Sequence, residues 1–139
     1  MATKPSSLPR ATTTHLVSGI AMHHIYCDRK KSYIVDRAQT LKLGGFYVFG
    51  KPGRVVVEGE RDDVLRYERD LRCLRWQKIQ VMGRVACNER RLIVETAPTD
   101  SFMLIECESE ADLFRRLLDA QLDEIVATLK RPFGAPRTL

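Results

Sequence analysis

Along the first two thirds of the chain, the spacing of apolar positions changes repeatedly between that of a strand and that of a helix. Alternating or continuous apolar runs predict strands, and apolar residues three or four positions apart predict helices. We therefore expect six elements in the order β-α-β-β-α-β, at residues 20–26, 28–41, 46–49, 54–58, 62–74 and 78–87. This order is the split βαβ arrangement, in which we expect two helices to cover one face of a four-stranded antiparallel sheet.

Local signals place the first helix and the middle strands. Asp28 is a good N-cap for that helix, and the pair Gly44-Gly45 is expected to end it. The sequence Gly50-Lys51-Pro52-Gly53 supplies fixed and positive φ angles, which predicts a hairpin between the two strands that flank it. The three valines at residues 55–57 are typical of a central strand that is covered on at least one side.

The last third of the chain predicts a strand pair, at residues 92–96 and 102–107, followed by one long helix. Ser109 is the expected N-cap of this helix, with Asp112 at its N3 position, and the helix should reach Lys130 before Pro132 stops it. Its wide apolar face predicts a packing surface made of Leu113, Phe114, Leu117, Leu118, Leu122, Ile125, Val126 and Leu129.

These elements predict an α+β fold, a ferredoxin-like β-α-β-β-α-β sandwich with a C-terminal strand pair and a long helix added. The 139 residues are enough for one domain, which we place at residues 18–131. Residues 1–17 are rich in Ser, Thr and Pro and predict a flexible leader, with a transit peptide as the alternative, and residues 132–139 predict a flexible tail. No apolar run approaches the ~20 residues of a membrane-spanning helix, so no membrane partner is expected.

Charge is distributed unevenly along the chain, whose formal net charge is +5. Residues 1–91 hold 18 basic and 9 acidic side chains, whereas residues 92–139 hold 5 basic and 9 acidic ones. A basic body with an acidic C-terminal third indicates an anionic partner for the body, although an ordinary solvated surface would show the same bias.

Cysteine and histidine usage indicates neither disulfides nor a metal. The four cysteines, Cys27, Cys73, Cys87 and Cys107, have no C-x-x-C spacing and lie in or beside apolar runs, so we expect buried, reduced thiols. Reduced thiols favour a nuclear or cytoplasmic protein. Adjacent strand residues point to opposite faces, so His23 and His24 are poorly placed to chelate one metal, and no cofactor is expected.

Several segments together resemble a known family, the C-terminal domain of the splicing protein Prp3, which also follows RWD domains in some small proteins. The resemblance covers residues 20–81 and is looser over residues 102–129. It lies in His23-His24-Ile25-Tyr26, Leu43-Gly44-Gly45-Phe46, Gly50-Lys51-Pro52-Gly53, Val55-Val56-Val57-Glu58-Gly59 and Leu74-Arg75-Trp76. The resemblance implies a ferredoxin-like fold and, for the splicing branch, binding to the paired small nuclear RNAs of the U4/U6 particle.

RNA binding needs cations for phosphates and flat groups for bases. The candidate RNA-binding residues are Arg29, Lys30, Lys31, Lys51, Arg54, Arg75, Trp76 and Lys78. Trp76 is a candidate for base stacking, as are Tyr33 and Tyr47 with less support, although each also suits an ordinary packed position. The third strand lacks the aromatic set of RRM-type sheets, so we expect contacts from helix ends, the hairpin and loops.

Two functions remain open at this level. The favoured one is a non-catalytic RNA-associated module of a ribonucleoprotein assembly, in the direction of pre-mRNA splicing, with RNA and other proteins as partners. The alternative is a protein-interaction module that docks through its C-terminal helix or a sheet edge. An enzyme is not expected, because the sequence contains no Gly-rich phosphate loop, no nucleophile elbow and no recognisable carboxylate–histidine set.

Overall fold

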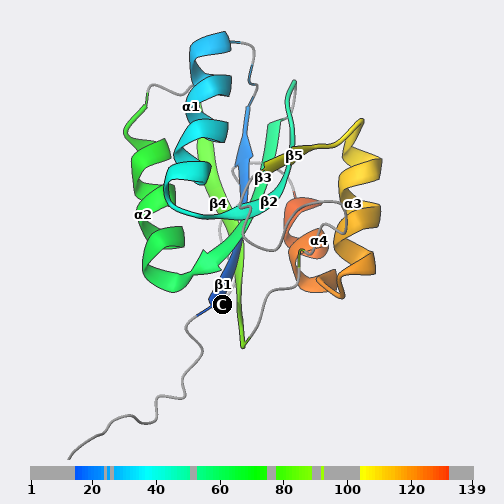
Figure 1. The fold of residues 1–139 in the computed structure, drawn as a ribbon. Helices are drawn as coiled ribbons and strands as arrows, with labels where there is room; N and C mark the ends of the chain where they lie inside the picture. Colours follow the sequence, from blue (N-terminus) through cyan, green and yellow to red (C-terminus); the bar gives the residue numbers. More distant parts are fainter. Residues whose placement is uncertain are drawn as a thin grey trace, which may run out of the picture.

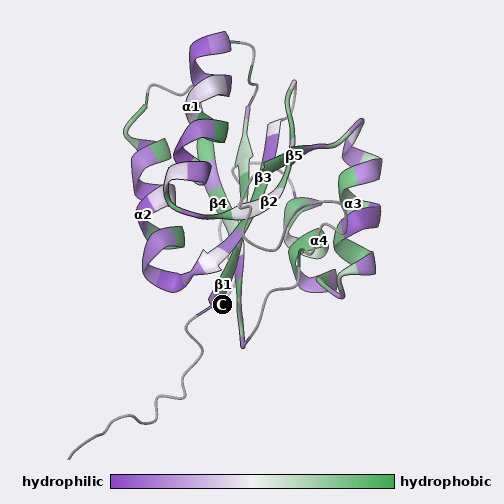
Figure 2. Ribbon diagram, in the orientation of Figure 1, coloured by the Kyte–Doolittle hydropathy of each residue, from purple (hydrophilic) through white to green (hydrophobic). Residues whose placement is uncertain are grey.

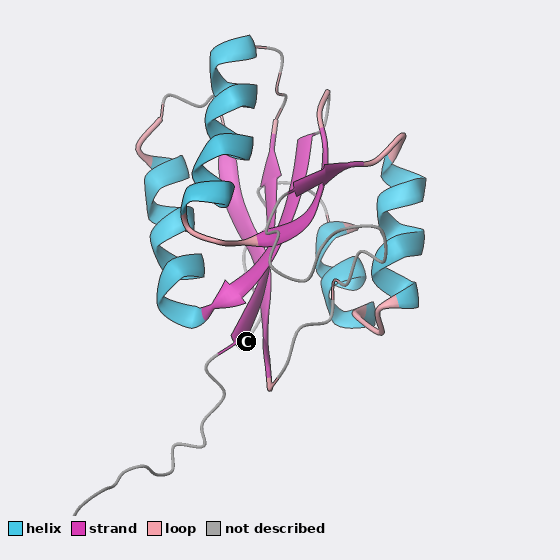
Figure 3. Ribbon diagram, in the orientation of Figure 1, coloured by secondary structure: helices cyan, strands magenta, loops and turns pink. Residues whose placement is uncertain are grey.

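The fold comes from a computed structural model that describes residues 15–23, 25, 27–50, 53–74, 78–88, 92 and 104–131 (Figures 1 and 3). These residues form five strands and four helices. In chain order they are β1 (His15–Met22), α1 (Asp28–Thr40), β2 (Gly44–Val48), β3 (Gly53–Glu60), α2 (Arg61–Arg72), β4 (Ile79–Cys87), β5 (Leu104–Glu106), α3 (Glu110–Asp119) and α4 (Asp123–Leu129).

All five strands belong to one sheet with the order β4-β1-β3-β2-β5. The first four strands pair antiparallel, and the β-α-β-β-α-β element order is as predicted. The valine run of residues 55–57 lies in β3, between β1 and β2, which confirms that it is a central strand. The fifth strand, β5, extends the sheet beyond the predicted four strands and lies parallel to β2.

Helices cover both faces of this sheet, so the domain has three layers. The sequence predicted two helices on one face and did not place the added C-terminal helix. Figure 1 shows α1 and α2 on one face and α3 and α4 on the other. Each face has its own core, because successive strand residues point to opposite sides: Val55 and Val57 pack toward α1 and α2, whereas Val56 packs toward α3 and α4. Figure 2 shows that the strands between the layers are largely hydrophobic and that α1 and α2 carry hydrophilic residues outward.

The first strand begins at His15, earlier than the predicted residue 20, and ends at Met22. Its early start has a simple cause: Leu16 and Val17 are both buried, one on each face of the sheet. The predicted leader therefore overlaps β1 at residues 15–17, and the remainder of the leader lies outside the described residues. The same holds for the predicted tail at residues 132–139.

The predicted first helix, residues 28–41, ends one residue early in the structure, and its predicted N-cap and the role of its glycine pair are corrected. Cys27 is the N-cap of α1 and Asp28 lies in the first turn. The helix ends at Thr40, and Gly45 lies inside β2 instead of ending α1. Gly45 has a φ of 150°, and a Cβ atom there would lie 1.9 Å from the carbonyl oxygen of Val56, so the close strand contact requires glycine.

The predicted long C-terminal helix is wrong, because the chain forms two helices. Gln121 adopts a φ of 62° between α3 and α4, and the amide of Leu122 donates to the carbonyl of Leu117 at 2.9 Å, which closes α3. The N-cap prediction is confirmed, since Ser109 Oγ accepts a 3.1 Å hydrogen bond from the amide of Asp112. Within the predicted apolar face, Leu118 is 47% exposed and does not belong to the core.

Of two further predictions, the structure leaves one untested and corrects the other in part. Of the predicted strand at residues 92–96, only Leu92 lies within the described residues; it is buried, and its amide donates a 2.6 Å hydrogen bond to the Glu58 carboxylate. Cysteine burial was also predicted wrongly in part. Cys87 and Cys107 are buried, whereas Cys27 and Cys73 are exposed, and none of the four forms a disulfide.

Candidate nucleic-acid interface

The antiparallel order of the strands brings three chain connections to one end of the sheet. At this end β1 finishes, β3 and β4 begin, and α1 starts immediately after the β1 connection. Sequence reasoning could not place these connections relative to one another. The structure therefore settles whether the segments predicted to contact RNA lie together.

Backbone hydrogen bonds join the three connections directly. The amide of His23, just after β1, donates to the carbonyl of Lys78, just before β4, at 3.1 Å. The amide of Ile25 donates to the carbonyl of Gly50 in the β2–β3 connection at 2.9 Å. The connection after β1 thus lies between the other two and is bonded to both.

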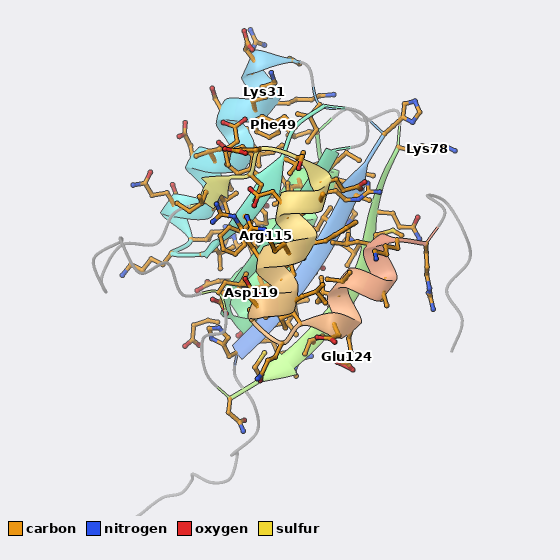
Figure 4. All side chains as sticks on the ribbon, turned by 90° about the vertical axis from the view of Figure 1, so that its right-hand side faces the viewer. Lys31, Phe49, Lys78, Arg115, Asp119 and Glu124 are labelled. Atoms are coloured by element: carbon orange, nitrogen blue, oxygen red, sulfur yellow. The ribbon has the colours of Figure 1, made fainter. Side chains whose placement is uncertain are left out.

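Four predicted cations lie at this end: Arg29, Lys30, Lys31 and Lys78. We call these four side chains the basic end. The first three occupy the first turn of α1. Arg29 and Lys78 are exposed, and Lys30 and Lys31 are half-buried. Figure 4 shows Lys31 and Lys78 at the same end of the sheet, with Phe49 close to Lys31.

Phe49 joins α1 to the β2–β3 connection, a role that sequence reasoning missed. The Nζ atom of Lys31 lies 5.5 Å from the centroid of its ring, within the range of a cation–π contact. The ring also lies 4.4 Å, centroid to centroid, from that of Tyr47. Burial raises the pKa of the Tyr47 hydroxyl, with Glu106 adding to the shift. Both aromatic rings are therefore packed against neighbours.

The electrostatics of the first turn of α1 favour negative charge. The pKa of the exposed Cys27 thiol is lowered, first by the nearby backbone amides of Lys30 and Arg29 and then by the charges of these two side chains. A helix N-terminus concentrates unpaired amides and a partial positive charge, and here three cationic side chains outnumber the one carboxylate of the first turn, Asp28. The same environment that stabilises a thiolate also suits a phosphate oxygen.

Arg54 was predicted to bind RNA, but the structure buries it. As the second residue of β3 it lies near the same end of the sheet, beneath α3 and α4 and apart from the exposed cations. It is only 7% exposed, on the face of the sheet that α3 and α4 cover. Its Nε atom lies 3.2 Å from Glu110 Oε2, and its guanidinium donates to the carbonyls of Gly53 and Leu129 at 3.3 and 3.4 Å. Burial lowers the Arg54 pKa, and Glu110 opposes that shift. Its geometry is that of a residue holding α3 and α4 to the sheet.

The remaining predicted site residues, Lys51, Arg75 and Trp76, lie outside the described residues. Tyr33 is half-buried in α1 and packs on the core between α1, α2 and the sheet. Within the part of the chain that the structure describes, no three His, Cys, Asp or Glu side chains could hold a metal ion. No helix among the described residues is long and apolar enough to cross a membrane.

The opposite helix layer carries the opposite charge. Helices α3 and α4 hold two arginines, Arg115 and Arg116, against five carboxylates: Glu110, Asp112, Asp119, Asp123 and Glu124. Figure 4 shows Asp119 and Glu124 on this layer, away from the end that carries Lys31 and Lys78. The basic-to-acidic change along the sequence is therefore also a separation in space, with the cations of the basic end apart from most of these acids.

A comparison with protein families identifies the domain. The model described as small nuclear ribonucleoprotein Prp3, C-terminal domain, matches residues 19–117. The chain belongs to this family. The match to the Prp3 C-terminal domain includes the second half of β1, all of β2 to β5 and most of α3, so it spans both faces of the sheet. It also confirms the family that the sequence motifs indicated.

Among solved structures, the chain overlaps with one described as a bacterial light-regulated adenylyl cyclase. The TM-score is 0.45 and the sequence identity 13%, over 84% of this chain and 35% of the other. The chain thus spans about a third of that protein's length. So distant a likeness supports no statement about fold or activity.

Proposed function

We propose that this Prp3 C-terminal domain is a non-catalytic RNA-associated module that works in a nuclear ribonucleoprotein assembly, in pre-mRNA splicing. The observation that carries the proposal is the meeting of Arg29, Lys30, Lys31 and Lys78 at one end of the sheet. The family description supports the setting, because it names a small nuclear ribonucleoprotein. Small nuclear RNA and other proteins of such a particle are the proposed partners.

Phosphate binding follows from the charges and the helix geometry. Cationic side chains that approach RNA phosphates displace condensed counterions, which gives affinity that falls steeply with salt. The first-turn amides of α1 add donors for one phosphate oxygen. Shape and backbone contacts of this kind suit structured RNA, whose sequence is poorly accessible to side chains in the narrow groove.

Fold and chemistry both agree with a binding module. We assign the unit from β1 to β4 to the ferredoxin-like class on the strength of its element order, and regard β5, α3 and α4 as an addition to it. Our proposal includes no reaction, because the basic end offers cations and backbone amides to an anion. Their arrangement suits holding RNA in place.

Charge reversal at matched positions tests the proposal. The variant Lys30→Glu/Lys31→Glu changes the basic end, whereas Lys42→Glu/Arg61→Glu makes the same change in net charge at the opposite end, where α1 finishes and α2 begins. Binding to an RNA duplex and to an oligouridine with the same number of phosphates is measured over a series of salt concentrations. Circular dichroism shows whether both variants are folded.

We expect the basic-end variant to weaken binding by more than about tenfold and to reduce the salt slope by about 2, since about one counterion is released per phosphate contact. The variant at the opposite end should bind nearly as tightly as the wild type. Equal weakening by both variants would mean that net charge alone attracts RNA. Undetectable or salt-insensitive binding by the wild type would overturn the function itself.

A second candidate function, protein docking, is favoured by one observation. Leu118 in α3 is 47% exposed while its neighbour Leu117 is fully buried. If another protein covers α3, Leu118→Ser should abolish its capture from a nuclease-treated extract without lowering the unfolding temperature. Release of every captured protein by the nuclease, or capture unaffected by Leu118→Ser, would argue against docking through α3.

A further inference from the structure

Ile25 occupies the centre of the contacts that join the three connections at the basic end. It is 1% exposed, although it lies in the short connection between β1 and α1. Two residues before it, His23 bonds to Lys78, and two residues after it, the Cys27 carbonyl accepts the amide of Lys31 at 3.0 Å. The position of Ile25 is therefore coupled to Lys31 in α1 and to Lys78 before β4.

The Ile25 side chain lies where a side chain of Gly53 would otherwise lie. A Cβ atom on Gly53 would be 2.4 Å from Ile25 Cδ1 and 2.5 Å from Ile25 Cγ1. Both distances are far shorter than any van der Waals contact. The Ile25 side chain can therefore occupy this position only because residue 53 is glycine. The Ile25 amide also donates to the carbonyl of Gly50, on the other side of the same connection.

We propose that Ile25 is a positioning residue: seated on Gly53 and bonded to Gly50, it holds the first turn of α1, the β2–β3 connection and Lys78 as one preformed surface for RNA phosphates. This inference rests on the RNA-binding function proposed above. A preformed surface places its cations on several phosphates at once without an ordering cost at binding. If the surface is loosened, fewer of these cations contact phosphates at the same time, and fewer counterions are therefore released.

A compensating pair of substitutions tests this role. Gly53→Ala places a methyl group where the Ile25 side chain lies, and Ile25→Ala in the same chain removes the two clashing carbons. We expect Gly53→Ala alone to weaken RNA duplex binding by about tenfold and to reduce the salt slope by about 1, and the double variant to recover most of both. Leu117→Ala, a buried α3 position, provides a folded but destabilised control whose salt slope should stay at the wild-type value.

Amide hydrogen exchange of the free protein separates this inference from the proposed function. In Gly53→Ala, the amides of His23 and Ile25 should lose protection together, since one seat holds both connections. If Ile25 opens while His23 stays protected, or if Gly53→Ala retains the wild-type salt slope while Lys30→Glu/Lys31→Glu loses it, Ile25 is not the positioning residue. If the wild type binds no RNA, the proposed function fails, and the exchange result alone decides whether the three connections move as one.

Discussion

The Nε atom of Arg54, at the start of β3, lies 3.2 Å from Oε2 of Glu110, at the start of α3. This pair joins the central sheet to the acidic helix layer, and the guanidinium adds a bond to the last carbonyl of α4. Arg54, which its sequence neighbours indicated as an RNA ligand, thus has a structural role. The distinction between the two roles leads to a test.

Arg54→Ala should lower the free energy of unfolding by about 2 kcal/mol, because the buried carbonyls of Gly53 and Leu129 lose their donor. It should leave the salt slope of RNA binding unchanged. Lys31→Ala should do the reverse, with a reduced slope and little loss of stability. Urea unfolding and salt-dependent binding measure the two quantities, and a reduced slope for Arg54→Ala would show that Arg54 reaches the RNA.

Alanine substitutions at Gly45 and Gly50 test how closely β2 approaches β3, because only Gly45 lies against a neighbouring strand. Gly45→Ala should cost about 3 kcal/mol or more, since its Cβ would lie 1.9 Å from the Val56 carbonyl oxygen. Gly50→Ala meets nothing within 4 Å and should cost only about 1 kcal/mol for its φ of 117°. Similar urea midpoints for the two variants would contradict the close approach of β2 and β3.

Cys27 should be the thiol that alkylating reagents reach most readily near neutral pH. Its pKa lies below the usual 9.0 because the α1 backbone amides of Lys30 and Arg29 lie close to it, and it is exposed. Burial raises the pKa of Cys107 to about 11, and that thiol is buried. Iodoacetamide labelling across a pH series, read by mass spectrometry, checks the order. Faster labelling of Cys107 than of Cys27 would disprove this description of the α1 N-terminus.

The ionisation of Asp112 should make the free energy of unfolding depend on pH in the acidic range. The amide of Glu108 first, and then the charges of Arg116 and Arg115, hold the pKa of this carboxyl below its usual 3.8. A carboxyl whose pKa is lower in the folded than in the unfolded protein stabilises the fold above its unfolded pKa, and this contribution disappears as the pH falls through the folded pKa.

Asp112→Asn should therefore lower the urea midpoint at neutral pH, and its difference from the wild type should shrink as the pH drops below about 4. Glu124→Gln, an exposed change on the same layer, provides the control. A gap between wild type and Asp112→Asn that is constant across this pH range would show that the charge of Asp112 does not act on the fold.

Much of the fold was predictable because its signals are local. The valine run gave β3 its central place, and the Ser109 cap marked the start of α3. The break at Gln121 was not predictable, since a non-glycine residue with φ of 62° interrupts an otherwise regular apolar pattern. The burial of Arg54 was equally hidden, because Glu110 is distant in sequence and only tertiary packing brings it close.

The sequence indicated which residues could bind RNA, but it could not show which of them lie side by side on one surface. Lys30 and Lys31 adjoin a helix N-terminus in the sequence, yet their proximity to Lys78 depends on β1 and β4 being neighbours. Ile25 and Gly53 both lie in segments that carry the family resemblance, but nothing in the sequence pairs them, because each looks like an ordinary apolar or turn residue. Their roles appear only in the structure, where Ile25 occupies the space that a side chain at residue 53 would need.

The central claim is that RNA phosphates lie on the end of the sheet that carries Lys31 and Lys78. Chemical-shift mapping of the labelled protein during titration with an RNA duplex tests it most directly. We expect the amides of residues 29–31 and 78 to shift with one common dissociation constant that rises with salt, while the amides of Asp119 and Glu124 stay in place. Shifts centred on α3 and α4, or spread evenly over the molecule, would contradict the account.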